Sequence, residues 1–306
     1  MSRTRKLLNV VYILILLNIT YIFIFRHEQI LNYINDKITH MKAQNVIIPQ
    51  EVFNQNNYDF DTVETTTNFE PHDVSDLRKI YYTVLNNGWT SFTFYCTSEY
   101  ESCIDDVESI GNSSDYLTLI NNYVSPYNAY KKYNTLISGN EIYLSIDKLY
   151  TSEQILELQD FVDKTIKDLG INIGNPTVDD IRKIHDYLLE RISYDTDYEK
   201  NKTEEISNNA YGAINNGLAL CSGYTDTFNL FLDKLNIPNF KVTTEKHVWT
   251  AIYFNDKWSH IDLTWDDDEI NKNNNHNFFM ISTEDLLKKD KEEHSFDQEE
   301  FLEFKK

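Results

Sequence analysis

The 306-residue sequence contains little glycine, proline or cysteine, with 8, 5 and 3 residues respectively. This glycine content leaves little scope for a phosphate-binding loop, and neither a glycine-rich loop nor an internal repeat is present. Basic residues are also scarce, since 28 Lys and Arg stand against 49 Asp and Glu and give a formal net charge of −21. A field of that sign disfavours binding to nucleic acid or adhesion to anionic lipid. The 21 tyrosines and 17 phenylalanines instead indicate a folded chain with material for one or two domains.

One long uncharged run, residues 7–25, lies near the N-terminus and follows the basic stretch MSRTRK. A run of about 20 apolar residues crosses a bilayer as a helix. The alternatives are a buried helix and a cleaved signal peptide, but the apolar region of a signal peptide is usually about 7–15 residues long and ends at small residues. Here RHEQILNY follows, so we predict a retained signal anchor within residues 1–28. Basic residues also follow the span, but their clustering before it favours export of the remaining chain.

Three regions follow the predicted anchor. Residues 29–74 are polar and weakly patterned, which is typical of a linker or stalk, with one short helix expected near residues 30–41. Residues 75–150 mix helical and strand patterns and predict a small α/β domain. Residues 151–306 have more regular helical and strand patterns and predict a second domain. The fold class that we expect for the whole chain is α+β.

The small domain has recognisable local patterns. Residues 91–96 alternate aromatic residues with Thr and Ser, which predicts a strand. Residues 114–133 predict helical segments that are broken near Pro126. Residues 134–150 predict a hairpin that turns around Gly139.

Helix starts are expected at capping residues. Ser75 and Ser152 stand where the N-caps of two helices are predicted. Thr177 and Asp180 have the spacing of a capping box at the start of a third helix. Gly170 is expected to end the helix that begins at Ser152.

The three cysteines fall into two groups. Cys96 and Cys103 lie between the predicted strand and the next helix, and in an oxidising compartment they can pair. Two unpaired buried thiols are the alternative, because spacing alone does not establish bridging geometry. Cys221 then remains as the odd thiol, which fits a reactive role.

Cys221 begins an amphipathic helix in the stretch GLALCSGYTDTFNLFLDKLNIP. The apolar residues of that helix recur with helical spacing: Tyr224, Phe228, Phe231, Leu232 and Leu235. Free N–H groups and the positive end of the dipole favour an anion at a helix start, and the thiolate is the reactive form of cysteine. A small buried cysteine fits this position equally well, so the presence of a base decides between the two.

Two strand patterns, HVWTAIYF and KWSHIDLTW, follow this helix and flank Asn255 and Asp256. If these two residues form a two-residue hairpin loop, His247 and Asp262 are diagonal neighbours on one face, roughly 7–8 Å apart at the backbone. A shift of one residue in register would place them on opposite faces.

Such a pair has a chemical use. Asp262 can accept the proton of one nitrogen of His247 and fix its tautomer, which leaves the other nitrogen to take the proton of a thiol. Each residue alone has an ordinary structural explanation, as a histidine at a strand start and an aspartate in a strand. A carboxylate among aromatic and aliphatic residues nevertheless requires a partner, because its burial is otherwise costly.

The stretches YGAINNGLALCSGYTDTFNLFLDKLNIP, HVWTAIYFNDKWSHIDLTWDDD and IRKIHDYLLERISYDTDY together resemble the transglutaminase-like superfamily, over roughly residues 152–281. The resemblance implies a papain-like core, in which a nucleophile helix packs on an antiparallel sheet. It also implies that Cys221 is the nucleophile, His247 the base and Asp262 its orienting residue, with Trp265 packed behind the site. The oxyanion donors are not assigned by it, and the backbone N–H of Cys221 is a natural one.

Other polar residues are predicted to be structural. His260 is a rival base near Asp262, but it has no catalytic counterpart in the family. His185 lies beside the apolar stripe of its helix and is expected to pack there with one hydrogen bond. Residues 266–269 lack the alternation and central glycine of a calcium loop and predict a solvated acidic loop. No set of cysteines and histidines has zinc spacing, so we expect neither a metal nor a cofactor.

Two classes of function remain. The first is a membrane-anchored thiol enzyme at the cell surface, which forms an acyl-enzyme with a protein or peptide substrate. Water then completes hydrolysis of the amide or peptide bond, or an amine completes cross-linking. The second is a catalytically inactive relative that serves as a surface binding or structural module. A complete Cys–His–Asp set favours the enzyme, and neither class involves nucleic acid.

Overall fold

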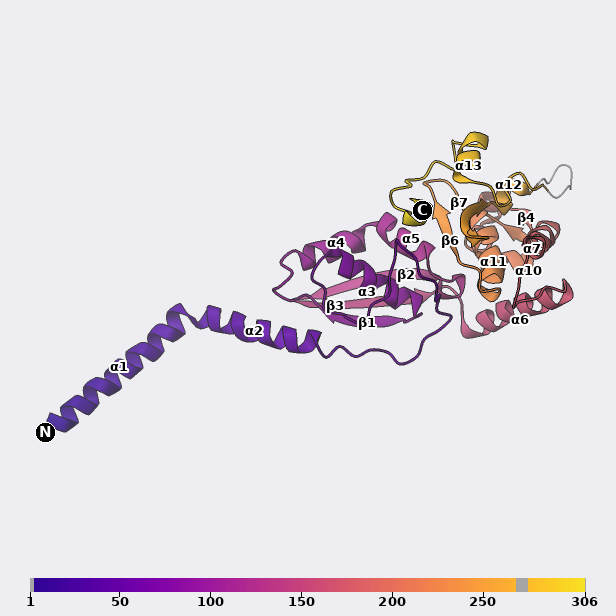
Figure 1. Cartoon of the computed structure of the whole chain (residues 1–306). Helices are drawn as coiled ribbons and strands as arrows, with labels where there is room; N and C mark the ends of the chain where they lie inside the picture. Colours follow the sequence, from indigo (N-terminus) through magenta and orange to yellow (C-terminus); the bar gives the residue numbers. More distant parts are fainter. Residues whose placement is uncertain (1–2, 268–274, 306) are drawn as a thin grey trace.

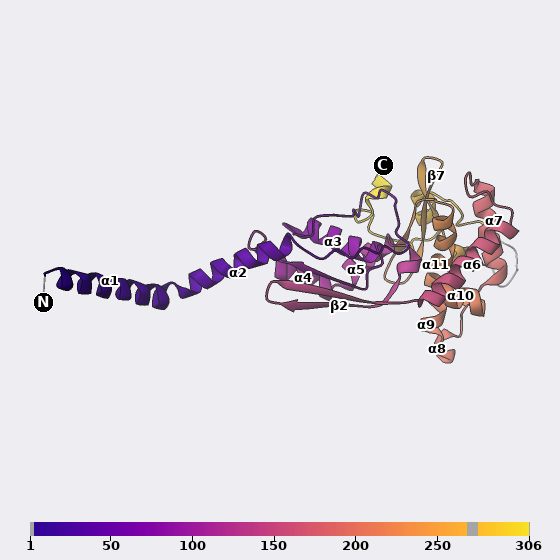
Figure 2. The ribbon, with the colours of Figure 1, turned by 90° about the horizontal axis from the view of Figure 1, so that it is seen from below.

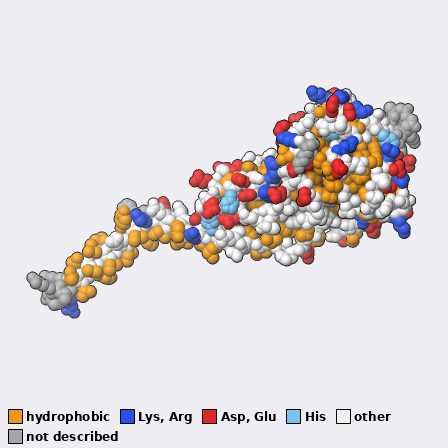
Figure 3. All heavy atoms as spheres, in the orientation of Figure 1, with side chains coloured by type: hydrophobic (Ala, Val, Ile, Leu, Met, Phe, Trp, Pro, Cys, Tyr) orange, Lys and Arg blue, Asp and Glu red, His pale blue; other side chains and the backbone are white. Residues whose placement is uncertain are grey.

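The computed structural model of the chain describes residues 3–267 and 275–305. Two helices, α1 (Arg3–Phe25) and α2 (His27–Ala43), form an arm that projects away from the body of the molecule (Figures 1 and 2). Within α1, the window Leu7–Ile24 is long and apolar enough to cross a membrane, and none of it is buried against the protein. Hydrophobic side chains cover most of α1 in Figure 3. The helix predicted in the linker is confirmed as α2, and it is longer than expected.

A three-stranded antiparallel sheet, ordered β1-β3-β2, lies at the centre of the first part of the body. Its strands and the helices that share its apolar core are β1 (Ser91–Tyr95), β2 (Tyr130–Ser138), β3 (Glu141–Lys148), α3 (Val74–Asn86), α4 (Cys103–Asn112) and α5 (Ser114–Asn122). The predicted hairpin is confirmed, since Ser138 pairs with Glu141 and Gly139 has a φ of 59° in the turn.

The helical prediction for residues 130–133 is wrong. A short 3-10 turn, η1 (Pro126–Asn128), follows α5, and β2 begins directly after it at Tyr130. Pairing with β3 and stacking of Tyr133 on Tyr81 hold this segment in the sheet. Tertiary packing therefore overrides the local helical pattern.

Two of the predicted helix caps are displaced by one or two residues. Helix α3 is capped by Asp73, whose side chain accepts the N–H of Asp76, and not by Ser75. Helix α6 (Ser152–Asp168) is capped by Thr151 and not by Ser152, because a capping box forms at Thr151. In both cases the residue with an extended backbone provides the cap. The capping box predicted for Thr177 at the start of α7 (Val178–Arg191) is confirmed.

A second antiparallel sheet, ordered β6-β7-β8, forms the centre of the second part of the body. Its strands and the helices that share a core with it are β6 (Asn239–Thr243), β7 (Val248–Phe254), β8 (Lys257–Ile261), α6 (Ser152–Asp168), α7 (Val178–Arg191), α10 (Ala210–Asn216) and α11 (Cys221–Lys234). Shorter elements complete the chain: β4 (Ser193–Tyr194), α8 (Tyr198–Asn201), α9 (Glu204–Ser207), β5 (Leu218–Ala219), α12 (Leu263–Asp266), α13 (Thr283–Lys289) and η2 (Leu302–Lys305). A helix packed on an antiparallel sheet confirms the predicted α+β class.

Both faces of the β6-β7-β8 sheet are covered. Ile252 and Ile261 belong to the core that contains α11, whose predicted inward residues are all buried. On the other face, Phe240 and Trp249 belong to the core of the first part of the body. Each fully buried side chain of this size contributes about 1.5–3 kcal/mol, so the sheet is held rigidly between the two cores.

Segments from both ends of the body pack together beside this sheet. Residues between α2 and α3 form no helix or strand, yet Phe60 is buried in the core of the first part. Glu303, near the C-terminus, accepts hydrogen bonds from the N–H of Thr62 (3.0 Å) and the hydroxyl of Tyr123 (2.7 Å). Part of the predicted linker thus packs on the body. The boundaries at residues 74 and 150 stay a prediction.

Cys96 and Cys103 form a disulfide, with Cα atoms 5.7 Å apart. The bond joins the residue after β1 to the first residue of α4. Of the two alternatives that the sequence leaves open, the structure has the bridged one. Cys221 is the free cysteine in the described part of the chain.

Candidate active site

Cys221 is the first residue of α11 and is half-buried. The preceding Leu220 is the N-cap with an extended backbone, and its N–H donates to the carbonyl oxygen of Ser207 (2.8 Å). Because Cys221 lies in the first turn, its own N–H has no acceptor within the helix. A backbone donor and the positive end of the helix dipole therefore lie beside the thiol.

Gly223 determines how closely this first turn approaches the segment that contains Ser207. A Cβ atom at Gly223 would lie 2.3 Å from the carbonyl oxygen of Ser207 and 2.9 Å from the Cβ of Ala219. Both distances are shorter than real Cβ contacts, and the closer atom belongs to the backbone. The missing side chain therefore allows Cys221 to occupy its observed position.

Gly223→Ala should lower the free energy of unfolding by about 1–3 kcal/mol, because the helix or the Ser207 segment must move away. Urea denaturation followed by circular dichroism measures this change. Gly174→Ala is the matched control, since a Cβ there would meet Asn172 at 3.6 Å, an ordinary contact. Equal stability of the two variants would contradict the close packing described for Gly223.

The predicted hairpin is confirmed in its turn and its register. Asn255 and Asp256 form the two-residue turn, with φ values of 53° and 60°, as a type I′ turn requires. The ladder runs from this turn to the pair Thr250 and Ile261. This register brings the start of β7 and the end of β8 to the same end of the sheet.

The predicted continuation of the second strand to Trp265 is wrong, because β8 ends at Ile261. Asp262 instead caps α12, and its Oδ1 accepts the N–H of Trp265 (3.2 Å). The other oxygen, Oδ2, lies 2.6 Å from Nε2 of His247, the residue that precedes β7. A helix cap, and not a strand position, thus holds the carboxylate against the imidazole.

The thiol of Cys221 lies near the imidazole of His247 and contributes to raising the pKa of that ring. Since Nε2 of His247 faces Asp262, Nδ1 is the nitrogen available to the thiol. One turn along α11, the hydroxyl of Thr225 lies 3.1 Å from the carbonyl oxygen of Val248, which fixes the helix against β7. The structure therefore places the thiol beside the imidazole that contacts the carboxylate.

The charged forms of His247 and Asp262 stabilise each other. Burial lowers the pKa of His247, but the charge of Asp262 and the hydrogen bonds to Asp262 and Cys221 outweigh burial and raise that pKa above its ordinary value. Burial raises the pKa of Asp262, but the charge and hydrogen bond of His247 outweigh it and hold that pKa below its ordinary value. An imidazolium held in this way places a positive charge beside the thiol, which favours the thiolate.

His294 is a site residue that the sequence prediction does not contain. It is fully buried, and its Nε2 lies 2.9 Å from Oδ2 of Asp262, the same oxygen that faces His247. Its Nδ1 lies 2.7 Å from Asp290. Its ring also packs on Trp265, which is 37% exposed and so is less deeply placed than the resemblance implies. The sequence signal was a single histidine in the charged stretch KEEHSFDQ, and no spacing rule connects it to the hairpin.

His260, the rival base, has a structural role. Its Nδ1 accepts the indole N–H of Trp249 (3.0 Å), so its proton lies on Nε2, which donates to the hydroxyl of Thr283 (2.9 Å). Burial and the neighbouring His294 lower the pKa of His260 to about 3. The ring is therefore neutral near pH 7, and both of its nitrogens are occupied.

Two expectations about the surrounding polar residues are wrong. His185 is buried, but it contacts two carboxylates where one hydrogen bond was expected, Asp186 at 3.1 Å and Asp266 at 3.2 Å. Asp266 is fully buried and is not solvated. Asp267 accepts a hydrogen bond from a buried tyrosine hydroxyl. The rest of the predicted acidic loop, residues 268–269, lies outside the described residues.

Two groups of histidine and acidic side chains in the described part of the chain place three potential metal ligands within 4.8 Å of one another. They are His247, Asp262 and His294, and His185, Asp186 and His276. In the first group all three residues are buried, and two imidazole nitrogens share one carboxylate oxygen. In the second group two residues are accessible to solvent. Spacing rules do not reveal either group, because its members come from distant segments.

Residues 167–263 match the family model described as the transglutaminase-like superfamily. The match includes Cys221, His247 and Asp262 and ends directly after the last of them. This part of the chain is therefore a transglutaminase-like domain, as the sequence resemblance indicates. No curated protein matches the sequence.

Two solved structures resemble part of the chain. One is a TGase, with 16% sequence identity and a TM-score of 0.35, and the similar region covers 47% of this chain and 46% of that protein. The other, described as a putative cysteine protease, comes from Cytophaga hutchinsonii, with 14% identity and a TM-score of 0.27 over 44% of this chain and 61% of that protein. The chain thus spans less than two thirds of either protein.

Proposed function

We propose that this chain is a thiol enzyme that acts on amide or peptide bonds through an acyl-enzyme at Cys221. The observation that carries the proposal is the buried contact between His247 and Asp262, 2.6 Å long, beside the thiol that contributes to the raised pKa of the same imidazole. The transglutaminase-like match over these residues supports it. Cys221 is the nucleophile, His247 is the general acid and base, and Asp262 is a positioning residue.

The proposed reaction has two steps. The thiolate sulfur of Cys221 attacks the substrate carbonyl carbon, and a C–S bond forms as the C–N bond breaks. The imidazolium of His247 gives its Nδ1 proton to the departing amine. Water or a second amine then attacks the thioester while His247 takes its proton, and the C–S bond breaks to restore the thiolate. The N–H of Cys221 is the donor that we assign to the carbonyl oxygen.

We further propose that α1 anchors the enzyme in a membrane and that the body lies outside the cytoplasm. The apolar and unburied window Leu7–Ile24 supports the anchor, and the basic stretch before it supports this orientation. Proteins or peptides at the cell surface are then the substrates. The acidic character of the chain, with a net charge of −21, disfavours nucleic acid as a partner.

A catalytically inactive surface module is the second candidate. The half-buried state of Cys221 is compatible with it, because a thiol of that exposure also occurs as a packing residue. The raised pKa of His247 favours the enzyme, since a silent module gains nothing from a protonated imidazole next to a thiol.

Acyl-enzyme formation tests the proposal without knowledge of the substrate. Incubation of the full chain in detergent with an active ester such as p-nitrophenyl acetate should add one acetyl group, which peptide mapping should locate at Cys221. The Cys221→Ala variant should not gain it. An added primary amine then distinguishes the two fates, because transfer yields the acetylated amine and hydrolysis yields only acetate. Acetylation no faster than that of free cysteine would favour the inactive module.

A further inference from the structure

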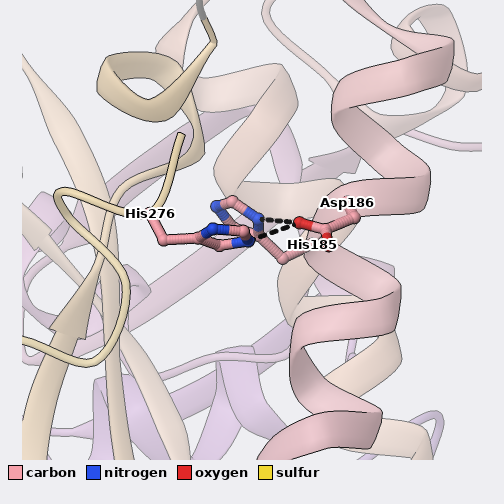
Figure 4. Close-up of side chains that lie close together, drawn as sticks. All are labelled: His185, Asp186 and His276. Carbon is pink, nitrogen blue, oxygen red and sulfur yellow. Dashed lines mark hydrogen bonds and ion pairs between the residues drawn. The ribbon is translucent and has the colours of Figure 1, made fainter. Parts of the chain in front are cut away.

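A second cluster of polar side chains lies where α7 meets the segment after α12. His185 and Asp186 are neighbours on α7. His276, which lies 90 residues after Asp186 in the sequence, contacts Asp186. Figure 4 shows the two imidazole rings converging on the carboxylate of Asp186. Nδ1 of His185 lies 3.1 Å and Nε2 of His276 lies 2.7 Å from the same oxygen, Oδ1. Three potential metal ligands thus meet at one point.

Both ring nitrogens of His185 face carboxylate oxygens. Its Nε2 lies 3.2 Å from Oδ2 of Asp266, and both side chains are fully buried. A neutral imidazole carries one N–H and one lone pair. When the N–H is donated to Asp266, the lone pair of Nδ1 faces a lone pair of the Asp186 carboxylate. A cation between these two atoms converts a repulsive contact into two attractive ones.

We propose that His185, Asp186 and His276 bind one zinc ion through Nδ1, a carboxylate oxygen and Nε2. Zinc binds such ligands tetrahedrally at about 2.0–2.2 Å, which places neighbouring ligand atoms roughly 3.3 Å apart. The observed separations of 2.7 and 3.1 Å are close to that spacing, so small side-chain rotations seat the ion. The side chains of Asp186 and His276 are 29% and 36% exposed, so the fourth position faces solvent.

Asp266 has the geometry of an orienting carboxylate. Metal-bound histidines usually donate their second N–H to a carboxylate, which fixes the tautomer, and Asp266 stands in this relation to His185. Its Oδ1 also accepts the N–H of Phe278 (2.9 Å), two residues after His276. Asp266 ends α12, the helix that Asp262 caps. Zinc would therefore link α7 to the segment after α12 and brace the turn that carries Asp262, whatever the function of Cys221.

Cobalt(II) is the probe for this site, because thiolate ligation produces a sulfur-to-cobalt charge-transfer band that nitrogen and oxygen ligation lacks. The full chain in detergent, stripped by a chelator, should bind one Co²⁺ without that band and release it to Zn²⁺. His276→Ala and Asp186→Asn should each weaken Zn²⁺ binding at least about tenfold, and Asp266→Asn by about 10–100-fold. Two variants should bind Zn²⁺ as the wild type does: Cys221→Ala and the matched control His72→Ala. His72 is another half-exposed histidine beside acidic side chains.

Three results would overturn the proposal. The first is that the chelator-stripped chain shows no saturable binding of Co²⁺. The second is a thiolate band that disappears in Cys221→Ala, since this would place the ion at the thiol. The third is wild-type affinity in both His276→Ala and Asp186→Asn. Circular dichroism verifies that these two variants fold, and both positions are accessible to solvent.

Discussion

Replacing His247 by alanine should slow the reaction of Cys221 with iodoacetamide at pH 6 by about tenfold to a hundredfold. An ordinary thiol with a pKa of about 8.5 is only about 0.3% thiolate at that pH, whereas a neighbouring imidazolium holds the thiol as a thiolate. The gain in alkylation rate from the larger thiolate fraction is partly offset, because a stabilised thiolate is a weaker nucleophile. The raised pKa of His247 keeps its ring protonated at pH 6, so the wild type has the ion pair under these conditions.

His247→Gln separates the effect of charge from that of packing. Glutamine has a similar bulk and an amide that can donate to Asp262, but it carries no positive charge. Its alkylation rate should therefore be as slow as that of His247→Ala. Mass spectrometry of the labelled Cys221 peptide measures each rate. Wild-type rates in both variants would show that the imidazole does not activate the thiol.

Asp262→Asn should lower the free energy of unfolding by about 3–5 kcal/mol near pH 6. Oδ2 of Asp262 lies 2.6 Å from His247 and 2.9 Å from His294, and all three residues are buried. Asparagine keeps the shape of the side chain but not its charge, so the buried imidazolium of His247 loses its counter-ion. Urea denaturation of the full chain in detergent measures the difference.

The pH dependence of this difference follows from the two pKa shifts. The pKa of His247 is raised, so its contribution is complete below the ordinary value of 6.5 and is lost as pH rises through the folded value. The pKa of Asp262 is lowered, so its contribution is complete above the ordinary value of 3.8 and is lost as pH falls through the folded value. The stability difference between wild type and Asp262→Asn should therefore be largest between these two ordinary values.

Asp290→Asn is the matched control for this experiment. Asp290 also accepts from His294, at 2.7 Å, but its side chain is 16% exposed. Its replacement leaves the pair of His247 and Asp262 intact, so its effect on stability should be smaller. The pKa of Asp290 is also lowered, so this effect should fade at low pH, but it should not fade as pH rises through the folded pKa of His247. An equal loss of stability in the two variants would contradict the assignment of the main ion pair to Asp262.

The local parts of the site were predictable from the sequence. Asn255 and Asp256 between two alternating patterns fix a two-residue turn, and the turn fixes the register that brings His247 and Asp262 to one end of the hairpin. The apolar spacing after Cys221 likewise fixes the start and the buried face of α11. Both features depend on residues that are close in sequence, where periodicity and turn chemistry are decisive.

The remaining parts depend on contacts between distant segments. His294 reaches Asp262 across 32 residues, and His276 reaches Asp186 across 90. No periodic pattern records such a meeting, because each histidine stands alone in a polar stretch. The strand that begins at Tyr130 was missed for a related reason, since pairing with β3 and not local propensity determines its conformation.

The pH dependence of Cys221 alkylation in the wild-type chain tests the central claim most directly, namely that Cys221 and His247 form a thiolate–imidazolium pair. The account predicts a rate that changes little between about pH 6 and pH 8, and a steep dependence in His247→Ala. A wild-type rate that falls about tenfold with each unit of decreasing pH, as it does for an ordinary thiol, and that is the same in His247→Ala, would contradict it.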